Sequence, residues 1–147
     1  MDRKEYDDLA DQLKPKNHMF KNAFYAFLYG GVIGMIAQGL LEFYMYIYHC
    51  NQKEATPMMI ITLVFIACLL TGLGLYDKLA KKAGAGTFIP ITGFANSMAA
   101  SAMDAKSEGL VLGIASNMFK LGGTVITFGI VSSSLLGVIR YVFTLFR

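Results

Sequence analysis

Long apolar runs separated by short charged links make up most of this 147-residue chain. The first run, residues 23–48, and the second, residues 58–76, are long enough for helices that cross a hydrocarbon core of roughly 30 Å. Pro57 is expected in the first turn of the second helix, where a missing amide costs little. A shorter run over 87–103 and a fourth over 109–139 follow. The pattern predicts an all-α integral membrane protein with about four transmembrane segments.

The third run is unusual because polar and helix-breaking residues interrupt it. Its sequence, TFIPITGFANSMAASAM, contains Pro90, Gly93, Asn96 and Ser97 in an otherwise apolar stretch. Proline removes a backbone donor, and an amide in hydrocarbon needs a hydrogen-bond partner. Irregular backbone at membrane depth is tolerated where protein or a water-filled cavity receives it. We therefore expect a short, broken third segment that either packs closely against other helices or lines a pathway.

The fourth run is interrupted as well. Residues 109–119 are too few to span a bilayer alone. Lys120, Gly122 and Gly123 then separate them from a second apolar stretch, residues 124–139. The sequence thus predicts a second break, bracketed by Asn117 and Lys120.

The sequence allows two membrane topologies for the third and fourth apolar runs. Either residues 87–103 cross the membrane completely, or residues 87–120 form a re-entrant hairpin with both ends on one side. Lysine and arginine concentrate in cytoplasmic loops, so we expect the basic N-terminus and the 77–86 connection on the cytoplasmic face. The two C-terminal arginines favour the complete crossing, because it returns them to that same face.

Composition agrees with a membrane class. Apolar residues make up 55% of the chain and charged residues 16%, against roughly 25% charged in soluble domains. Residues 1–21 are expected to form a polar, amphipathic tail, and residues 22–147 the transmembrane domain. A chain of this length is too small to enclose a wide pathway alone, so any pore would be shared with other subunits. The absence of a basic stripe with interleaved aromatic residues argues against a nucleic-acid partner.

Polar side chains inside predicted spans are functional candidates. Gln38 and Glu42 are four residues apart and share one helix face. They line a pathway or make a polar contact, or else Glu42 reaches water at the outer interface. Asn96 and Ser97 either line the first break, where the amide could close a freed carbonyl or meet a solute, or simply pack against another helix. Lys120 must face water, form a pair or snorkel, and so either attracts an anion in a pathway or marks a membrane edge.

Glycines form a second group of candidates. Gly30, Gly31 and Gly34 in the first span, and Gly122 and Gly123 in the last, would let helix backbones approach closely. We expect these positions to contact another helix, in this chain or in a neighbouring subunit.

The sequence contains no recognisable catalytic set. It lacks a nucleophile elbow, a phosphate-binding loop and an HExxH motif, and its histidines and cysteines are not clustered. We therefore expect no enzyme activity, no catalytic residues, no bound metal and no cofactor.

Four blocks of sequence also carry a family likeness: FLYGGVIGMIAQG, GLGLYDK, AGAGTFIPITGFANSM and EGLVLGIASNMFKLGGTVITFG. In this order and at these spacings they resemble the stage V sporulation protein A membrane subunits, the SpoVAC and SpoVAEB group. The resemblance covers residues 20–135, and the charged N-terminal tail favours the SpoVAC branch of the group.

This resemblance implies an integral protein of the inner (forespore) membrane of a spore-forming bacterium. Its implied partners are other SpoVA proteins, such as SpoVAD and SpoVAEB. The implied solute is dipicolinic acid (pyridine-2,6-dicarboxylate) or its calcium chelate, taken up during sporulation and released at germination. Channel opening under membrane tension is a further implication. The alternative is a non-conducting membrane scaffold for the sister subunits.

Overall fold

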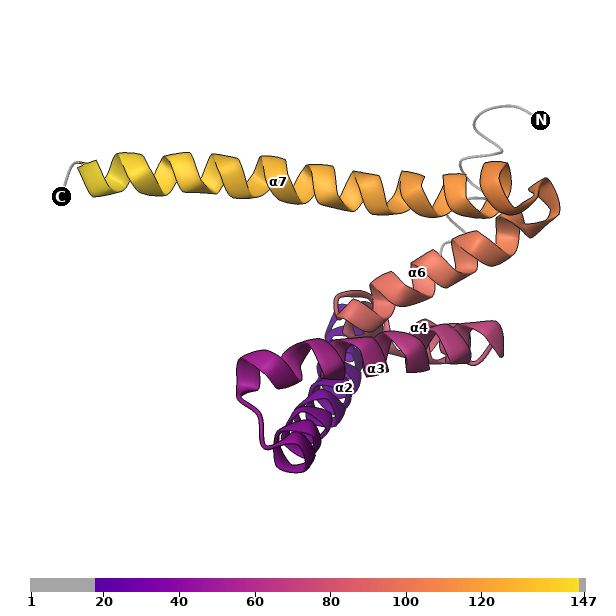
Figure 1. Cartoon of the computed structure of the whole chain (residues 1–147), viewed down its shortest axis with the longest axis horizontal. Helices are drawn as coiled ribbons and strands as arrows, with labels where there is room; N and C mark the ends of the chain where they lie inside the picture. Colours follow the sequence, from indigo (N-terminus) through magenta and orange to yellow (C-terminus); the bar gives the residue numbers. More distant parts are fainter. Residues whose placement is uncertain (1–17, 146–147) are drawn as a thin grey trace.

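The computed structural model describes residues 18–145, and all regular structure in that range is helical (Figure 1). The expected amphipathic tail lies mostly outside these residues. The elements in chain order are α2 (Met19–Tyr48), α3 (Gln52–Gly72), α4 (Tyr76–Ala83), α5 (Ala85–Phe88), α6 (Ile91–Asp104), a 3₁₀ turn (Ala105–Glu108), a π-helical turn (Leu110–Ala115) and α7 (Ser116–Leu145).

Three helical stretches are long and apolar enough to cross a membrane: α2, α3 and the continuous run Leu110–Leu145. Large apolar side chains cover their outer surfaces. Phe20, for example, is 92% exposed and Leu112 is 81% exposed. Soluble proteins rarely expose apolar surface on this scale, so these helices fit a hydrocarbon environment. The all-α membrane fold with a short, broken third segment is confirmed.

The second helix begins six residues earlier than the apolar pattern indicates. It starts at Gln52, and the amide of Asn51 donates to the Glu54 carboxylate at 3.2 Å. Asparagine followed three residues later by glutamate is a helix-start signature. Pro57 therefore lies inside the helix and not in its first turn, so the expected placement was wrong. Its ring removes the amide that would otherwise bond to the Lys53 carbonyl.

The same helix ends at Gly72, four residues before the expected boundary. Gly74 has a φ of 67°, and its amide bonds to the carbonyl three residues earlier at 2.9 Å. The amide of Leu75 bonds to the carbonyl five residues earlier, also at 2.9 Å. This pair of bonds is the Schellman ending, which favours glycine at the left-handed position. The chain reverses there, so Tyr76 starts α4 rather than ending α3.

The short helix α5 lies directly against α2. A side chain at Gly86 would overlap the backbone carbonyl of Ala26. From the other side, a Cβ at Gly30 would lie 3.5 Å from the Gly86 backbone. Only glycine at position 86 allows the two backbones to come this close, and the contact fixes the start of the third segment against the first helix.

The third and fourth runs form a hairpin. Figure 1 shows α6 and α7 meeting at the turn formed by residues 105–109, from which α7 runs back well beyond α6. With 14 residues, α6 is about 21 Å long, short of a hydrocarbon core of roughly 30 Å. Its length favours the re-entrant arrangement over a complete third crossing.

The expected break beside Lys120 is absent, because α7 is one uninterrupted helix from Ser116 to Leu145. Each glycine in a helix costs about 1 kcal/mol relative to alanine. Opening the helix in an apolar environment would leave backbone groups without partners, which costs more. The chain breaks instead at Gly109, whose φ is 93°.

Candidate functional site

The site is built where α6 packs against α3. Small residues allow this contact: Ala67 of α3 is 1% exposed and Ala95 of α6 is 2% exposed. The Thr71 hydroxyl lies 2.7 Å from Oδ1 of Asn96 and 2.7 Å from the Ala67 carbonyl oxygen. Because a hydroxyl carries one proton, it donates to one of them at a time. The Asn96 amide thus has a partner on a neighbouring helix and not at the break itself.

The break in the third segment lies at Ile89 and Pro90, between α5 and α6. In a continuous helix the Thr87 carbonyl would accept the amide of residue 91. Here it accepts the Tyr76 hydroxyl of α4 at 2.9 Å. The same hydroxyl lies 3.1 Å from Oγ1 of Thr92, on the far side of the break. One buried tyrosine therefore holds both ends of the interruption.

Gly93 lies in the first turn of α6 and is buried. A Cβ there would overlap the carbonyl oxygen of Phe88 and lie 2.6 Å from that of Thr87. Gly93 therefore allows the first turn of α6 to fold back over the end of α5, which keeps the break compact.

A polar groove of about 450 Å³ runs along the hairpin between α6 and α7. Its lining consists of small, hydroxyl, amide and carboxylate side chains with one leucine: Ser97, Ala100, Ser101, Asp104, Ala105, Glu108, Asn117 and Leu121. Ser97, Ser101 and Asp104 follow one another at helical spacing, so they form a single polar face of α6. We call this feature the hairpin groove.

Two of the sequence candidates meet in the hairpin groove. The Ser97 hydroxyl donates to the Gly93 carbonyl at 3.0 Å, and Nδ2 of Asn117 donates to the Gly113 carbonyl at 3.1 Å. Oδ1 of Asn117 has no hydrogen bond among residues 18–145, so it is available to water or a solute. The groove thus presents oxygen acceptors along an otherwise apolar hairpin.

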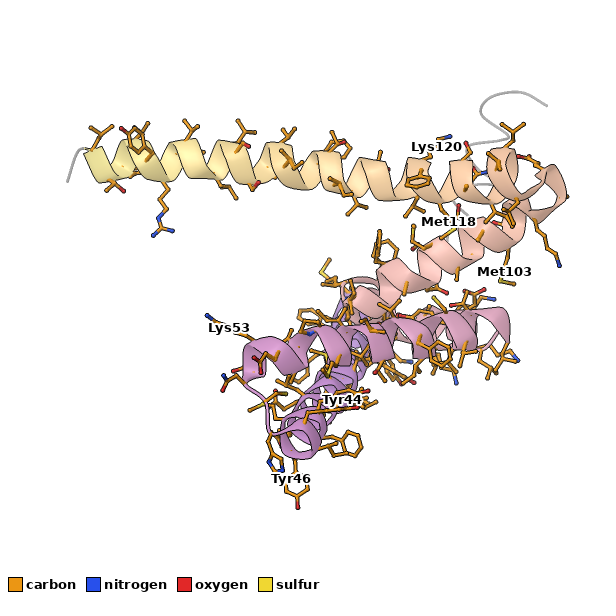
Figure 2. All side chains as sticks on the ribbon, in the orientation of Figure 1. Tyr44, Tyr46, Lys53, Met103, Met118 and Lys120 are labelled. Carbon is orange, nitrogen blue, oxygen red and sulfur yellow. The ribbon has the colours of Figure 1, made fainter. Side chains whose placement is uncertain are left out.

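Lys120 does not belong to this groove. Figure 2 shows its side chain on the side of α7 turned away from α6, whereas Met118 points toward α6. Gly122 faces α6, since a Cβ there would lie 3.9 Å from the Met98 methyl carbon, and Gly123 faces open space.

Gln38 and Glu42 lie on the exposed surface of α2. Nε2 of Gln38 donates to the Glu42 carboxylate at 2.9 Å, as their spacing predicts for one helix face. Among the neighbouring glycines, only Gly30 meets another element; a Cβ at Gly31 or Gly34 would have nothing within 4 Å. The polar pair and these two glycines are therefore open to lipid or to another subunit.

Two important residues escaped the sequence analysis. Tyr76 stands in a GLGLYDK corner, where it resembles an interfacial tyrosine, and Thr71 ends an apolar helix. The sequence did contain one indication of their role. A broken helix leaves backbone carbonyls without amide partners, so hydrogen-bond donors must come from residues outside it. Hydroxyl residues just before such a segment are the candidates to supply them.

No group of three or more His, Cys, Asp and Glu side chains suited to a metal ion occurs within residues 18–145. The two carboxylates of the hairpin groove, Asp104 and Glu108, are both exposed.

Residues 22–139 match the family described as SpoVAC/SpoVAEB sporulation membrane protein. The chain belongs to this family. It is also 48% identical over 141 residues to stage V sporulation protein AC of Bacillus subtilis (strain 168), covering 96% of this chain and 94% of that relative. No solved structure gives a significant match. Membership in the SpoVAC/SpoVAEB family makes this chain a sporulation membrane protein of the SpoVA group, as the sequence blocks indicated.

Proposed function

We propose that this SpoVAC/SpoVAEB family member is one subunit of a channel or transporter for dipicolinic acid and its calcium chelate in the inner spore membrane. The observation that carries the proposal is the hairpin groove. Serine, asparagine and carboxylate side chains line it, beside a helix too short to span the bilayer. Polar groups at such a site are costly unless they pair or face water, so they mark solute pathways.

A half-open groove suits a shared pathway. One wall is formed by α6 and the start of α7, and the other side is open in the single chain. Sister SpoVA subunits would supply the second wall and cover the exposed Gln38–Glu42 pair. Serine, asparagine and carboxylate oxygens can replace part of the hydration shell of a calcium ion, and the Ser101 hydroxyl can donate to a carboxylate of the solute. The groove chemistry therefore fits the calcium chelate better than the free dicarboxylate, which Asp104 and Glu108 would repel.

A second candidate function, a non-conducting scaffold, is supported by α7. Residues 123–145 of this helix are exposed throughout, and Figure 1 shows most of α7 projecting away from the other helices. A long apolar helix that projects beyond its own chain is suited to binding a sister subunit. This feature alone does not require that a solute pass through the chain.

Flux measurements separate the two functions. Dipicolinate release is measured from liposomes that contain this chain, the sister subunits, or both together. The channel proposal expects strong release only from the combination. It further expects Ser101→Leu, which fills the hairpin groove, to reduce release at least about tenfold while assembly is retained. The matched control is Ser133→Leu, on the exposed part of α7. Equal release for wild type and Ser101→Leu, or full release from sister subunits alone, would favour the scaffold.

A further inference from the structure

The helix α4 has two opposite faces with different chemistry. Tyr76 and Ala83 turn toward the protein and are 4% and 1% exposed. Lys78, Lys81 and Lys82 are exposed and fall on the other side of the helix, about 180° around its axis. We call these three residues the lysine face.

The surroundings of the lysine face are those of a membrane surface. The one carboxylate on α4 is Asp77, so the helix has a net positive charge. Three leucines beside it are strongly exposed: Leu73 at 70%, Leu75 at 43% and Leu79 at 41%. Leucines that enter the acyl region beside lysines that reach the headgroups are typical of an interfacial helix. Since α4 follows the end of a spanning helix after a three-residue turn, it lies where such an interface is expected.

The other face of α4 holds the break. The Tyr76 hydroxyl bonds to the Thr87 carbonyl at 2.9 Å, in place of the amide that a continuous helix would supply. Pro90 cannot donate either, so this carbonyl depends on Tyr76. A shift of α4 at the membrane surface would therefore reach both sides of the break through Tyr76, in addition to reaching α5 through Gly84, which joins the two helices.

We propose that the lysine face of α4 binds the headgroups of anionic phospholipids, and that Tyr76 couples this contact to the break between α5 and α6. The lipid contact rests on the membrane assignment and not on conduction of any solute. Anionic lipid fits better than a soluble anion, because the exposed leucines beside the lysines would be poorly placed in water and well placed among acyl chains.

The lipid contact is tested by native mass spectrometry of the full chain in mild detergent, after exposure to equal amounts of phosphatidylglycerol and phosphatidylcholine. We expect preferential retention of phosphatidylglycerol. Replacing all three lysines with glutamine (K78Q/K81Q/K82Q) should reduce this preference about tenfold. Lys53→Gln, at the opposite end of α3, and the charge-retaining triple arginine variant should keep it. Undiminished preference in the glutamine variant, or equal loss in Lys53→Gln, would overturn the lipid site.

The coupling is tested by amide hydrogen exchange of residues 85–96 in phosphatidylcholine vesicles with and without phosphatidylglycerol. We expect the anionic lipid to slow exchange several-fold in the wild type and to have no effect in the triple glutamine variant. Tyr76→Phe should still retain phosphatidylglycerol but exchange rapidly in both vesicles. A lipid effect of wild-type size in Tyr76→Phe would disprove the coupling.

A soluble anion provides the remaining comparison. Dipicolinate or inorganic phosphate is added to the chain in phosphatidylcholine vesicles that lack anionic lipid. We expect no slowing of exchange at residues 85–96. Slowing equal to that produced by phosphatidylglycerol would reassign the lysine face to a solute. Neither lipid test measures transport, so the proposed channel can fail without affecting them.

Discussion

Thr71 of α3 and Asn96 of α6 lie side by side, with the threonine hydroxyl 2.7 Å from Oδ1 of the asparagine. This polar contact lies next to the buried alanines Ala67 and Ala95, which belong to the apolar core cluster. Polar contacts between membrane helices contribute about 1 kcal/mol, so Asn96 helps to set how the broken segment sits on α3.

Asn96→Leu should therefore insert normally but weaken the contact between α3 and α6. We expect a loss of about 1 kcal/mol in stability, with a similar loss in Thr71→Val, because each removes one side of the same contact. The double variant should lose little more than either single one. Thermal unfolding in detergent measures this, and fully additive losses would mean that the two side chains act independently.

Dipicolinate release by Asn96→Leu with sister subunits should fall as the groove beside α6 shifts.

The close crossing of α2 and α5 gives a second prediction. Gly86→Ala should destabilise the chain by about 1–3 kcal/mol, because the added methyl group overlaps the Ala26 carbonyl and backbone cannot easily yield. Gly34→Ala is the matched control, since a Cβ there meets nothing within 4 Å. That variant should be neutral or slightly more stable, as alanine favours a helix. Equal effects of both substitutions on thermal stability would contradict the crossing.

The sequence was a good guide where spacing or chemistry acts locally. Four-residue spacing is enough to place Gln38 beside Glu42, and proline among apolar residues is enough to place a break near Pro90. The sequence shows that Asn96 needs a partner, but the partner Thr71 is 25 residues away and is chosen by packing. Contacts between helices depend on crossing geometry, which local patterns do not contain.

Local helix propensity gave a wrong prediction at the start of α7. Lysine and paired glycines usually weaken a helix, so Lys120, Gly122 and Gly123 suggested an interruption. In an apolar environment the backbone retains its internal hydrogen bonds despite weak residues. The turn forms where a glycine can adopt a positive φ, at Gly109. Environment therefore outweighs propensity in this part of the chain.

Membrane topology gives a third prediction. Single cysteines at Lys53, Lys81 and Lys106 are introduced into a chain whose Cys50 and Cys68 have been replaced. Lys53 and Lys81 should label from opposite sides, with Lys81 on the cytoplasmic face, because α3 separates them. Lys106 should label from the same side as Lys81, since α6 is too short to cross. Labelling of Lys106 together with Lys53 would instead establish a complete third crossing.

The last prediction concerns Lys120. The uncharged residues 121–139 lie between Lys120 and Arg140, and these two cations are about 30 Å apart along a straight helix. That length matches the hydrocarbon core, so we expect Lys120 to anchor one edge of the last span rather than to face the pathway.

Lys120→Glu should then lower abundance and reduce the flux of a dianion and of a neutral solute of similar size by the same factor. Lys120→Arg should behave like the wild type, because the cation that anchors the edge is retained. Both fluxes are measured in the same proteoliposomes made with sister subunits. A loss confined to the dianion and diminished by added salt would show that Lys120 acts electrostatically on the solute, because salt screens exposed charges. Its orientation away from the hairpin groove in Figure 2 argues for the anchoring role.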